Sequence, residues 1–349
     1  MEPLALAVMG AGLIGRQHID RIEKAAECRL AAIVDPATDA PQTAKQQGVT
    51  HYSNIADALA NEVFDGVIIA TPNALHIEHA EQCLARNLPI LIEKPIAHES
   101  AAAKSLLTAE RDHGHKILVG HHRVHSPIME TAREIVSSGV LGSITTVMGS
   151  AQFYKPAAYF DEALWRTKRG GGPILINLIH EIGNLRTLVG EISSVQAMAS
   201  SAARNFEVED TVAITLRFDS GALGTFMLSD SAVSSASWEH TARENPAYPH
   251  DPNQDCYQIS GTKGSLAVPT MRVKSFTDNQ EVSWWSPMDE QKINYEAADP
   301  LVRQLNHFCD IIRGTAKSKV SAFDGLQNLL VTEAIAKSIS AGRAIEIER

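Results

Sequence analysis

A glycine-rich segment near the N-terminus is the first candidate for chemistry. Residues 10–15, GAGLIG, follow an apolar run over 4–10, open a helical pattern and match G-x-G-x-x-G. In that context the first glycine permits a tight turn, the second lets the backbone approach a pyrophosphate, and the third lets helix and strand pack closely. The free N–H groups at the helix start would bind the phosphates. We expect a dinucleotide to contact Gly10, Gly12, Leu13, Ile14 and Gly15.

Asp35 lies 20 residues after Gly15, at the end of the second apolar run. A carboxylate at that position would accept hydrogen bonds from both ribose hydroxyls of NAD and would repel a 2′-phosphate. The two residues that follow are Pro36 and Ala37, so no adjacent cation is available for such a phosphate. The sequence therefore predicts that NAD is preferred over NADP. The alternative is a glycine-rich turn with Asp35 as an ordinary cap of the strand end.

Lys94 is the first candidate for the chemical step. It follows Glu93 and precedes Pro95 at the end of the apolar run 89–94, and open α/β sheets place their ligands at the carboxyl ends of strands. Partial burial beside a positive nicotinamide would lower the pKa of this lysine, so that it could exchange a proton with a substrate hydroxyl or polarise its oxygen. A surface ion pair with Glu93 is the alternative. The bond before Pro95 is a candidate for the cis form.

Three histidines in the segment 121–125 suggest a metal site at first sight. His121 and His125 would lie one helical turn apart, but no Glu or Cys completes a ligand set. We therefore expect no metal. His121 and His125 are expected to pack or cap.

The elements that must position these residues fall into two regions. The first alternates short, continuously apolar runs with helical patterns, which is typical of strands covered on both faces in a parallel, doubly wound sheet. The expected strands are 4–10, 29–35, 66–71, 89–94 and 116–120, and the expected helices are 18–27, 76–87 and 100–114. This region predicts a Rossmann domain over 1–122.

Longer strand-like stretches begin near residue 143 and predict a large, open, mostly antiparallel sheet in a second α/β domain over 123–349. The expected strands are 143–154, 194–202, 210–218 and 221–230, with a hairpin at the turn 220–223 and an edge strand at 345–348. Helices are expected at 174–189, 299–313 and 322–341, and 238–256 is expected to form an ordered loop over a site. The last helix has the alternative of packing back on the Rossmann domain.

Composition narrows the class of protein. The chain has 349 residues with 31 Lys+Arg against 41 Asp+Glu, a net charge of -10, which argues against a general nucleic-acid binder. Four scattered cysteines without a Cys-x-x-Cys pair suit a reducing cytoplasm. No apolar run reaches about 18 residues and the start lacks a basic n-region, so neither a membrane span nor a signal peptide is expected.

Several motifs together resemble the Gfo/Idh/MocA oxidoreductase family, which includes glucose–fructose oxidoreductase and inositol dehydrogenases. They are the glycine loop, ATPN at 70–73 with His76, Glu-Lys-Pro at 93–95, and Gly-Gly-Gly-Pro at 170–173 followed by His180. The resemblance covers essentially the whole chain. It implies a Rossmann domain followed by an α/β domain that carries the substrate site and assembles through its open sheet, here into a homodimer or homotetramer.

The resemblance also implies roles for individual residues. Lys94 and His180 would be the catalytic acid/base pair, with Lys94 also touching cofactor and substrate. The further cofactor contacts would come from Thr71, Pro72, Asn73, His76, Glu93, His122 and Arg166. One position departs from the family: many sugar-oxidising members carry an aspartate four residues before the histidine, where this chain has Ile176. Asn177, three residues before His180, could reach a substrate hydroxyl from the same helix face but cannot act as a base.

The remaining substrate contacts are expected from strand ends and loops. The candidates are Arg123, Tyr154, Trp165, Arg166, Asn177, His180 and Trp238, with Asp230 as a further residue that could face the pocket. Trp165 and Arg166 begin a basic stretch that would suit a carboxylate or a hydroxyl-rich ring, or would simply be a solvated loop. Trp238 lies beside Glu239 in the Pro-rich loop, where it could hold a sugar ring or anchor the core.

We therefore predict an NAD-dependent dehydrogenase that transfers hydride between a ring hydroxyl of a cyclic polyol or pyranose-like sugar and the nicotinamide. The alternative within enzymes is oxidation of a cis-dihydrodiol of an aromatic carboxylate, which the missing aspartate slightly favours. A non-catalytic NAD-binding sensor is a more remote alternative, because a sensor has no need of Lys94 and His180.

Overall fold

The computed structural model describes residues 2–112, 114, 116–276 and 280–348, and the chain divides into two compact units. Unit 1 comprises Met1–His125 and Pro300–Leu329, and unit 2 comprises Ser126–Asp299 and Leu330–Arg349. The first boundary lies three residues beyond the expected one. The segment 300–329, which the sequence analysis placed in the C-terminal domain, belongs to unit 1.

Unit 1 contains a parallel six-stranded sheet, as the sequence predicts. Its strands pair in the order β3-β2-β1-β4-β5-β6, which is the doubly wound order of dinucleotide-binding domains. The strands are β1 (Leu4–Met9), β2 (Cys28–Val34), β3 (Thr50–Tyr52), β4 (Gly66–Ile69), β5 (Ile90–Ile92) and β6 (Ile117–Val119). The switch in strand order lies between β1 and β4, so the loops after these strands meet at one edge of the sheet.

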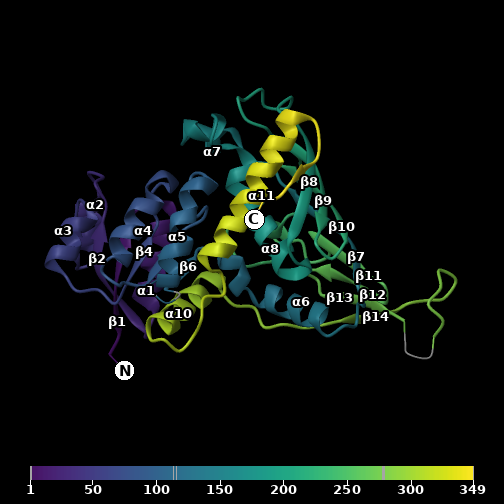
Figure 1. Ribbon diagram of the computed structural model, residues 1–349, viewed down its shortest axis with the longest axis horizontal. Coiled ribbons are helices and arrows are strands. Elements are labelled where there is room, and N and C mark those ends of the chain that lie inside the picture. The colour runs from purple at the N-terminus through teal and green to yellow at the C-terminus, as the bar shows by residue number, and fades with distance from the viewer. Residues whose placement is uncertain (1, 113, 115, 277–279, 349) are drawn as a thin grey trace. The chain divides into compact units, whose positions relative to one another are not determined.

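Helices lie against this sheet because its central strands are apolar on both faces (Figure 1). The helical elements are α1 (Leu13–Lys24), α2 (Ala40–Gln46), α3 (Ile55–Asn61), η1 (Asn73–Leu75), α4 (His76–Leu84), α5 (Ser100–Asp112), η2 (His122–His125) and α10 (Pro300–Ile312). In α1 the buried residues Gly15, His18, Ile19 and Ile22 recur at three and four positions and form one buried stripe.

Close packing explains why the segment 300–329 belongs to unit 1. Phe308 of α10 is fully buried, and a Cβ built on Gly66 of β4 would lie 2.7 Å from Ile312 Cδ1 and 3.1 Å from Phe308 Cζ. The helix therefore packs directly on the start of a central strand. The apolar pattern of 299–313 predicts a helix but does not indicate which of the two sheets the helix packs on.

Unit 2 contains a nine-stranded sheet that is antiparallel except for the parallel pair β7 and β10. The order is β14-β13-β12-β11-β7-β10-β9-β8-β15. The strands are β7 (Ile144–Gln152), β8 (Ile192–Ser200), β9 (Thr211–Phe218), β10 (Leu223–Ser229), β11 (Tyr257–Gly261), β12 (Gly264–Val268), β13 (Arg272–Ser275), β14 (Asp289–Lys292) and β15 (Ile345–Glu346). The predicted hairpin of β9 with β10 and the predicted edge strand β15 are both present.

One face of the nine-stranded sheet forms the core of unit 2 with helices. Buried side chains of α6 (Pro127–Ser137), α8 (Ile179–Val189) and the second half of α11 (Ala322–Ala341) pack with the inward residues of the strands. On β9 and β10 buried residues alternate with less buried ones, as a sheet packed on one side requires.

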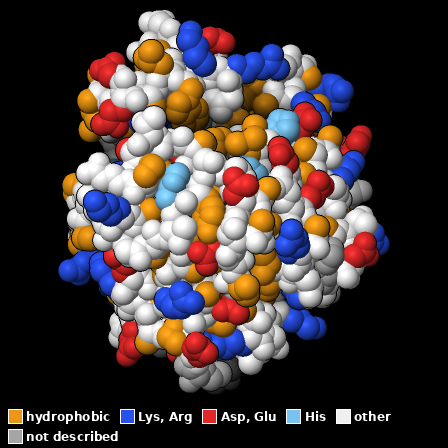
Figure 2. Space-filling model, turned by 90° about the vertical axis from the view of Figure 1, so that its left-hand side faces the viewer, with side chains coloured by type: hydrophobic (Ala, Val, Ile, Leu, Met, Phe, Trp, Pro, Cys, Tyr) orange, Lys and Arg blue, Asp and Glu red, His pale blue; other side chains and the backbone are white. Residues whose placement is uncertain are grey.

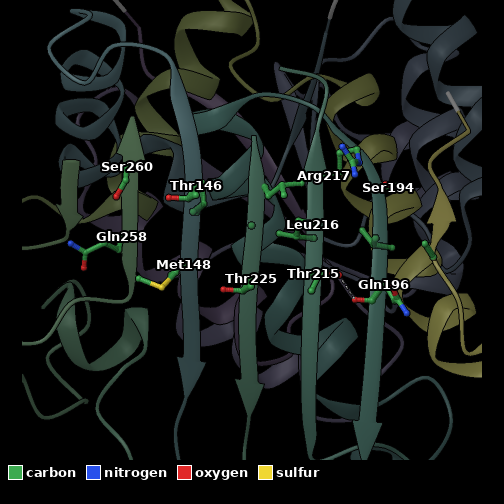
Figure 3. Close-up of a pocket in the computed structure, with 15 residues that line it drawn as sticks. Thr146, Met148, Ser194, Gln196, Thr215, Leu216, Arg217, Thr225, Gln258 and Ser260 are labelled. Carbon is green, nitrogen blue, oxygen red and sulfur yellow. Dashed lines mark hydrogen bonds between the residues drawn. The ribbon is translucent and has the colours of Figure 1, made fainter. Parts of the chain in front are cut away.

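The opposite face of this sheet carries exposed side chains (Figure 3). Thr146 and Met148 of β7, Thr225 of β10, and Thr215 and Arg217 of β9 line a shallow pocket across neighbouring strands. Exposed Met148, Met198, Leu223 and Met227 add apolar area to this face.

Some elements were absent from the prediction. The strand β3 has three residues without an apolar run, and all four residues of β14 are exposed, so their pairing is decided by the neighbouring strands. The helix α6 has Ser126 as N-cap and a proline in its first turn, signals that the sequence analysis did not use. None of the helices within the described ranges is long and apolar enough to cross a membrane.

Candidate functional site

The glycine loop has the backbone geometry that a dinucleotide requires. Gly10 has φ +86°, and a Cβ there would lie 2.5 Å from the carbonyl oxygen of Ala70. A Cβ on Gly15 would lie 1.8 Å from the carbonyl oxygen of Gly10. A Cβ on Gly12 would meet nothing within 4 Å, so the backbone is open on the side from which a pyrophosphate would approach the start of α1. The residues present therefore fit NAD.

The Asp35 side chain, at the end of β2, is hydrogen-bonded to the glycine loop. Its Oδ2 accepts a hydrogen bond from the backbone N–H of Ala11 at 2.6 Å, and its Oδ1 accepts from the N–H of Ala37 at 2.7 Å. The side chain is half-buried. Because each carboxylate oxygen can accept more than one hydrogen bond, both remain able to bind ribose hydroxyls.

Lys94 follows β5 and is held in place through its two neighbours. Nε2 of His18 lies 2.9 Å from Oε1 of Glu93, and both side chains are buried. The other carboxylate oxygen of Glu93 accepts from the backbone N–H of Lys94 at 3.1 Å. The bond between Lys94 and Pro95 is cis. Glu93 thus supports the Lys94 backbone, and the cofactor contact expected of it stays a prediction.

His76 fixes the other side of the same segment. Its Nδ1 lies 2.9 Å from the carbonyl oxygen of Pro95, and its Nε2 lies 2.8 Å from the carbonyl oxygen of Thr71. Burial lowers the pKa of His76, which favours the neutral ring, and a neutral ring donates to one carbonyl at a time. His76 therefore links the segments that follow β4 and β5. With both nitrogens turned to these carbonyls it helps to position the segment around Lys94, and the cofactor contact expected of it stays a prediction.

Thr71, Pro72 and Asn73 lie where the resemblance requires, between β4 and α4. The Thr71 hydroxyl lies 3.1 Å from Nδ1 of His79, and Pro72 precedes the short helix η1. They share the edge of the sheet with the glycine loop, because β1 and β4 are neighbouring parallel strands.

The histidine segment packs within unit 1. Nε2 of His125 lies 2.8 Å from Nδ1 of His307, and Nε2 of His121 lies 3.1 Å from the amide nitrogen of Asn328. Burial lowers the pKa of His125 to about 3. Within the described ranges no three His, Cys, Asp or Glu side chains could hold a metal ion. His121 and His125 are thus packing residues.

His122 lies within electrostatic reach of Lys94. Burial lowers the pKa of His122 well below its usual range, and the charges of Arg123 and Lys94 lower it further. The ring is therefore neutral at physiological pH. Arg123 is buried on the short helix η2, which limits the substrate contact expected from its guanidinium.

In unit 2 a largely buried lysine contacts two of the residues predicted to face the substrate. Lys155 follows β7, and its Nζ donates to Oδ1 of Asn177 at 2.8 Å and lies 3.6 Å from Oδ2 of Asp230. Asp230 also accepts from Nε of Arg204 at 2.9 Å. Burial lowers the pKa of Lys155 to about 8, although Asp230 acts in the opposite direction. Asn177 and Asp230 were predicted from the sequence to face the substrate, whereas Lys155 and Arg204 were not.

Arg166 belongs to the same group of side chains. It lies on the helix η3 (Leu164–Thr167), stacks 3.9 Å above the centre of the Tyr159 ring and donates to the Tyr159 carbonyl oxygen. Tyr154 and Trp165 are more than half exposed, and the Arg204 guanidinium lies 5.2 Å from the Tyr154 ring. These aromatic residues are accessible to a ligand in unit 2.

His180 lies in the first turn of α8 and is buried. Asn177 lies in the π-helix η4 (Ile174–Leu178) that runs directly into α8, so the predicted helix 174–189 is present but begins with wider turns. Such π segments are frequent at functional sites. The expected spacing on a regular helix face therefore does not hold between these two residues.

Trp238 is a correction. It is buried in the core of unit 2, its ring centre lies 6.0 Å from that of Tyr257, and its indole N–H donates to Oε2 of Glu244 at 2.7 Å. Of the two interpretations left open by the sequence, core anchor and sugar contact, the structure favours the anchor. The helix α9 (Trp238–Thr241) interrupts the loop expected over 238–256.

A lysine at a strand end, directly before a proline, is the signal that could have identified Lys155. The same arrangement drew attention to Lys94. Lys155 was passed over because no motif covers it and because Asp230, its partner, lies 75 residues away in the sequence.

Comparison with known proteins agrees with this geometry. Residues 4–121 match the model of the oxidoreductase family with an NAD-binding Rossmann fold, and residues 129–267 match the model of the GFO/IDH/MocA C-terminal domain. The rhizopine catabolism protein MocA of Rhizobium meliloti is 26% identical over 97% of this chain and 96% of its own length. An inositol 2-dehydrogenase of Renibacterium salmoninarum is 33% identical over 55% of this chain and 56% of its own.

A solved structure with the same fold is an oxidoreductase from Agrobacterium radiobacter in complex with NAD+, L-tartaric acid and magnesium. It superposes with a TM-score of 0.81 at 19% identity and covers 99% of both chains. The two family models together span most of the chain, and they agree with the glycine loop and with the motif around Lys94. The chain belongs to the Gfo/Idh/MocA family of oxidoreductases and is an enzyme with an NAD-binding Rossmann domain.

Proposed function

We propose that this enzyme oxidises a ring hydroxyl of a cyclic polyol or pyranose-like sugar and prefers NAD over NADP. The observation that carries the proposal is the placement of Lys94. It is held through two buried histidines at the same sheet edge as the glycine loop. Relatives named inositol 2-dehydrogenase support a polyol as the substrate class.

In the proposed reaction, the hydroxyl-bearing carbon loses a hydride and the hydroxyl loses a proton, which leaves a ketone. Bound NAD would supply the hydride acceptor. Lys94, half-buried after β5, and His180 of α8 would take and release the proton, and Asn177 would hold a ring oxygen. Glu93, His18 and His76 would keep the Lys94 backbone in place. In the reverse direction the same groups would protonate the alkoxide.

A second candidate is the oxidation of a cis-dihydrodiol of an aromatic carboxylate. The observation that favours it is the absence of a carboxylate at Ile176, together with the cations Lys155, Arg166 and Arg204 among the described side chains of the unit 2 site. Such cations suit a substrate carboxylate.

A spectrophotometric screen of NAD reduction separates these candidates. The panel contains inositols, pyranoses, anhydrosugars and aromatic cis-dihydrodiols, each with NAD and with NADP. Turnover of a polyol or sugar supports the proposal, and turnover of a dihydrodiol alone replaces it with the second candidate. NAD binding without oxidation of any ring in the panel or reduction of the matching ketones would reject both substrate classes.

Asp35→Asn is expected to reduce the preference for NAD. The variant keeps the size of the side chain but loses the charge that repels a 2′-phosphate and the acceptor of the ribose hydroxyls. The KM for NAD should rise about 10-fold to 100-fold, which corresponds to one or two hydrogen bonds to a charged group. Steady-state kinetics with both cofactors measures this change. Asp20→Asn, an exposed residue of α1, is the matched control. An unchanged ratio of the two KM values would reject the role of Asp35.

We further propose that the open face of the nine-stranded sheet binds a second copy of the chain, in a homodimer or homotetramer. Its exposed residues include Met148, 60% accessible, and Met198, 74% accessible, around a pocket of about 570 Å³ (Figure 3). Exposed apolar side chains on an extended sheet face are typical of interfaces.

Met148→Glu with Met198→Glu is expected to dissociate this assembly. Two carboxylates would have to be buried without partners, which is strongly unfavourable. Sedimentation velocity should show the wild type as a dimer or tetramer and the double variant as a monomer. Val63→Glu, an equally exposed apolar residue of unit 1, is the control. A monomeric wild type contradicts the proposal.

On the face shown in Figure 2, acidic and basic side chains are interspersed, and that distribution favours a small-molecule substrate over nucleic acid. The four cysteines are buried and keep their thiol form, which supports a reducing compartment such as the cytoplasm.

A further inference from the structure

The side-chain amide of Asn177 has a defined orientation. Its Oδ1 accepts from the Lys155 ammonium at 2.8 Å, and an ammonium group can only donate. The oxygen must therefore face Lys155, and Nδ2 points the other way. In the part of the chain that the structure describes, Nδ2 makes no hydrogen bond, and Asn177 is only half-buried. Asn177 thus presents a donor to its surroundings.

Lys155 is held firmly enough to impose this orientation. Its side chain is 12% accessible, and the ammonium lies 3.6 Å from Asp230 Oδ2 and 4.8 Å from the centre of the Tyr159 ring. Asp230 is fixed in turn by Nε of Arg204 at 2.9 Å. The ammonium therefore has a carboxylate on one side, a ring on another and the Asn177 oxygen on a third.

We propose that Lys155 is a positioning residue that makes Asn177 a hydrogen-bond donor to the substrate, so that the bound ring must offer an acceptor oxygen there. The inference rests on the proposed function, in which the turn before His180 meets the substrate. A carboxylate at this turn could only accept a hydrogen bond and would select a hydroxyl proton. An amide N–H₂ group instead donates a hydrogen bond. Its partner is therefore a carbonyl oxygen, an ether oxygen, a carboxylate or the lone pair of a hydroxyl.

The orientation should depend on pH. Burial lowers the pKa of Lys155 to about 8, so above that pH the neutral amine carries a lone pair and can accept from the Asn177 amide. The amide is then free to turn its oxygen to the substrate, and binding weakens. The charged and titratable groups around Lys155 are Tyr159, Arg166, Arg204, Glu209, Asp230 and Glu239.

The first test needs no substrate. In protein labelled with 15N-asparagine, the Asn177 side-chain signals are assigned by their loss in Asn177→Asp, and the pH is raised from 6 to 10. We expect these signals to shift with a midpoint near 8 in the wild type and to show no such transition in Lys155→Met. Lys274→Met removes an exposed lysine of β13 and should leave the transition in place. The proposal would be overturned if the chemical shifts of the Asn177 signals changed neither with pH nor in Lys155→Met.

The second test is kinetic and uses myo-inositol with NAD. Lys155→Met should raise KM about 10-fold or more while kcat changes little, because only the oriented hydrogen bond is lost. Lys155→Arg stays charged, so its KM should lie within about 3-fold of the wild-type KM. We expect kcat/KM of the wild type to fall above pH 8, and kcat/KM of Lys155→Arg should show no such fall. Equal losses in both variants, or an unchanged KM in Lys155→Met, would contradict the positioning role.

The two tests separate the two proposals. If the wild type oxidises no ring at all, the proposed function fails while the NMR titration still decides whether Lys155 orients Asn177. If the wild type turns over myo-inositol but the Asn177 signals are the same in Lys155→Met, the proposed function is supported and the positioning role is rejected.

Discussion

Lys94→Ala should reduce turnover with NAD by about 10³-fold while NAD affinity stays within about 3-fold of the wild type. The loss follows from removing the amine at the end of β5 that would exchange the hydroxyl proton. The affinity is retained because the glycine loop and Asp35 do not depend on this side chain. Stopped-flow turnover and calorimetric NAD titration measure the two quantities.

Lys104→Ala is the matched control, since Lys104 is an exposed residue of α5 in the same unit. Lys94→Arg then separates the two roles left open for the amine. An arginine can polarise an oxygen but does not give up its proton near neutral pH. If Lys94→Arg retains turnover, the amine only polarises the substrate oxygen. If Lys94→Arg loses as much turnover as Lys94→Ala, the amine exchanges the hydroxyl proton. Full activity in Lys94→Ala would remove Lys94 from the chemical step.

Gly15→Ala should destabilise unit 1 by at least about 3 kcal/mol and abolish NAD binding. A Cβ at this position would lie 1.8 Å from the carbonyl oxygen of Gly10, so β1 and α1 would have to move apart. Thermal unfolding followed by circular dichroism should show a lower Tm for this variant.

Gly12→Ala provides a sharp comparison. The φ of Gly12 is -71°, which alanine adopts without strain, and its Cβ would meet nothing within 4 Å. Stability should therefore be unchanged, whereas NAD affinity should fall about 10-fold or more because the methyl group occupies the side from which the pyrophosphate approaches. If Gly12→Ala binds NAD as the wild type does, the phosphates do not lie against this loop. If Gly15→Ala is fully stable, the close packing of β1 with α1 is not required.

Much of the fold follows from local sequence patterns. The strands of unit 1 are short continuous apolar runs, and the glycine loop fixes the turn between β1 and α1, so both could be located from the sequence. The pairing of β9 with β10 followed from a short turn and alternating residues. The strands β11 to β14 were missed because each has only four or five residues and their pairing depends on the neighbouring strand.

The site was predictable where a motif is contiguous and was missed where it is not. Residues 10–15 and 93–95 are local, so type and spacing alone identify them. Lys155, Asn177, Arg204 and Asp230 come from four separate segments, and no spacing in the sequence connects them. The opposite error occurred at Trp238, which has the residue type of a ligand contact but is buried in the core of unit 2.

The sequence by itself determined the nucleotide-binding class and the division into a parallel and a mostly antiparallel sheet. These depend on backbone conformation and on the period of apolar residues, which each segment carries on its own. The tertiary structure alone decided which polar groups face each other. Donor and acceptor assignments, such as that of the Asn177 amide, depend on a partner such as Lys155, which folding brings to within 2.8 Å.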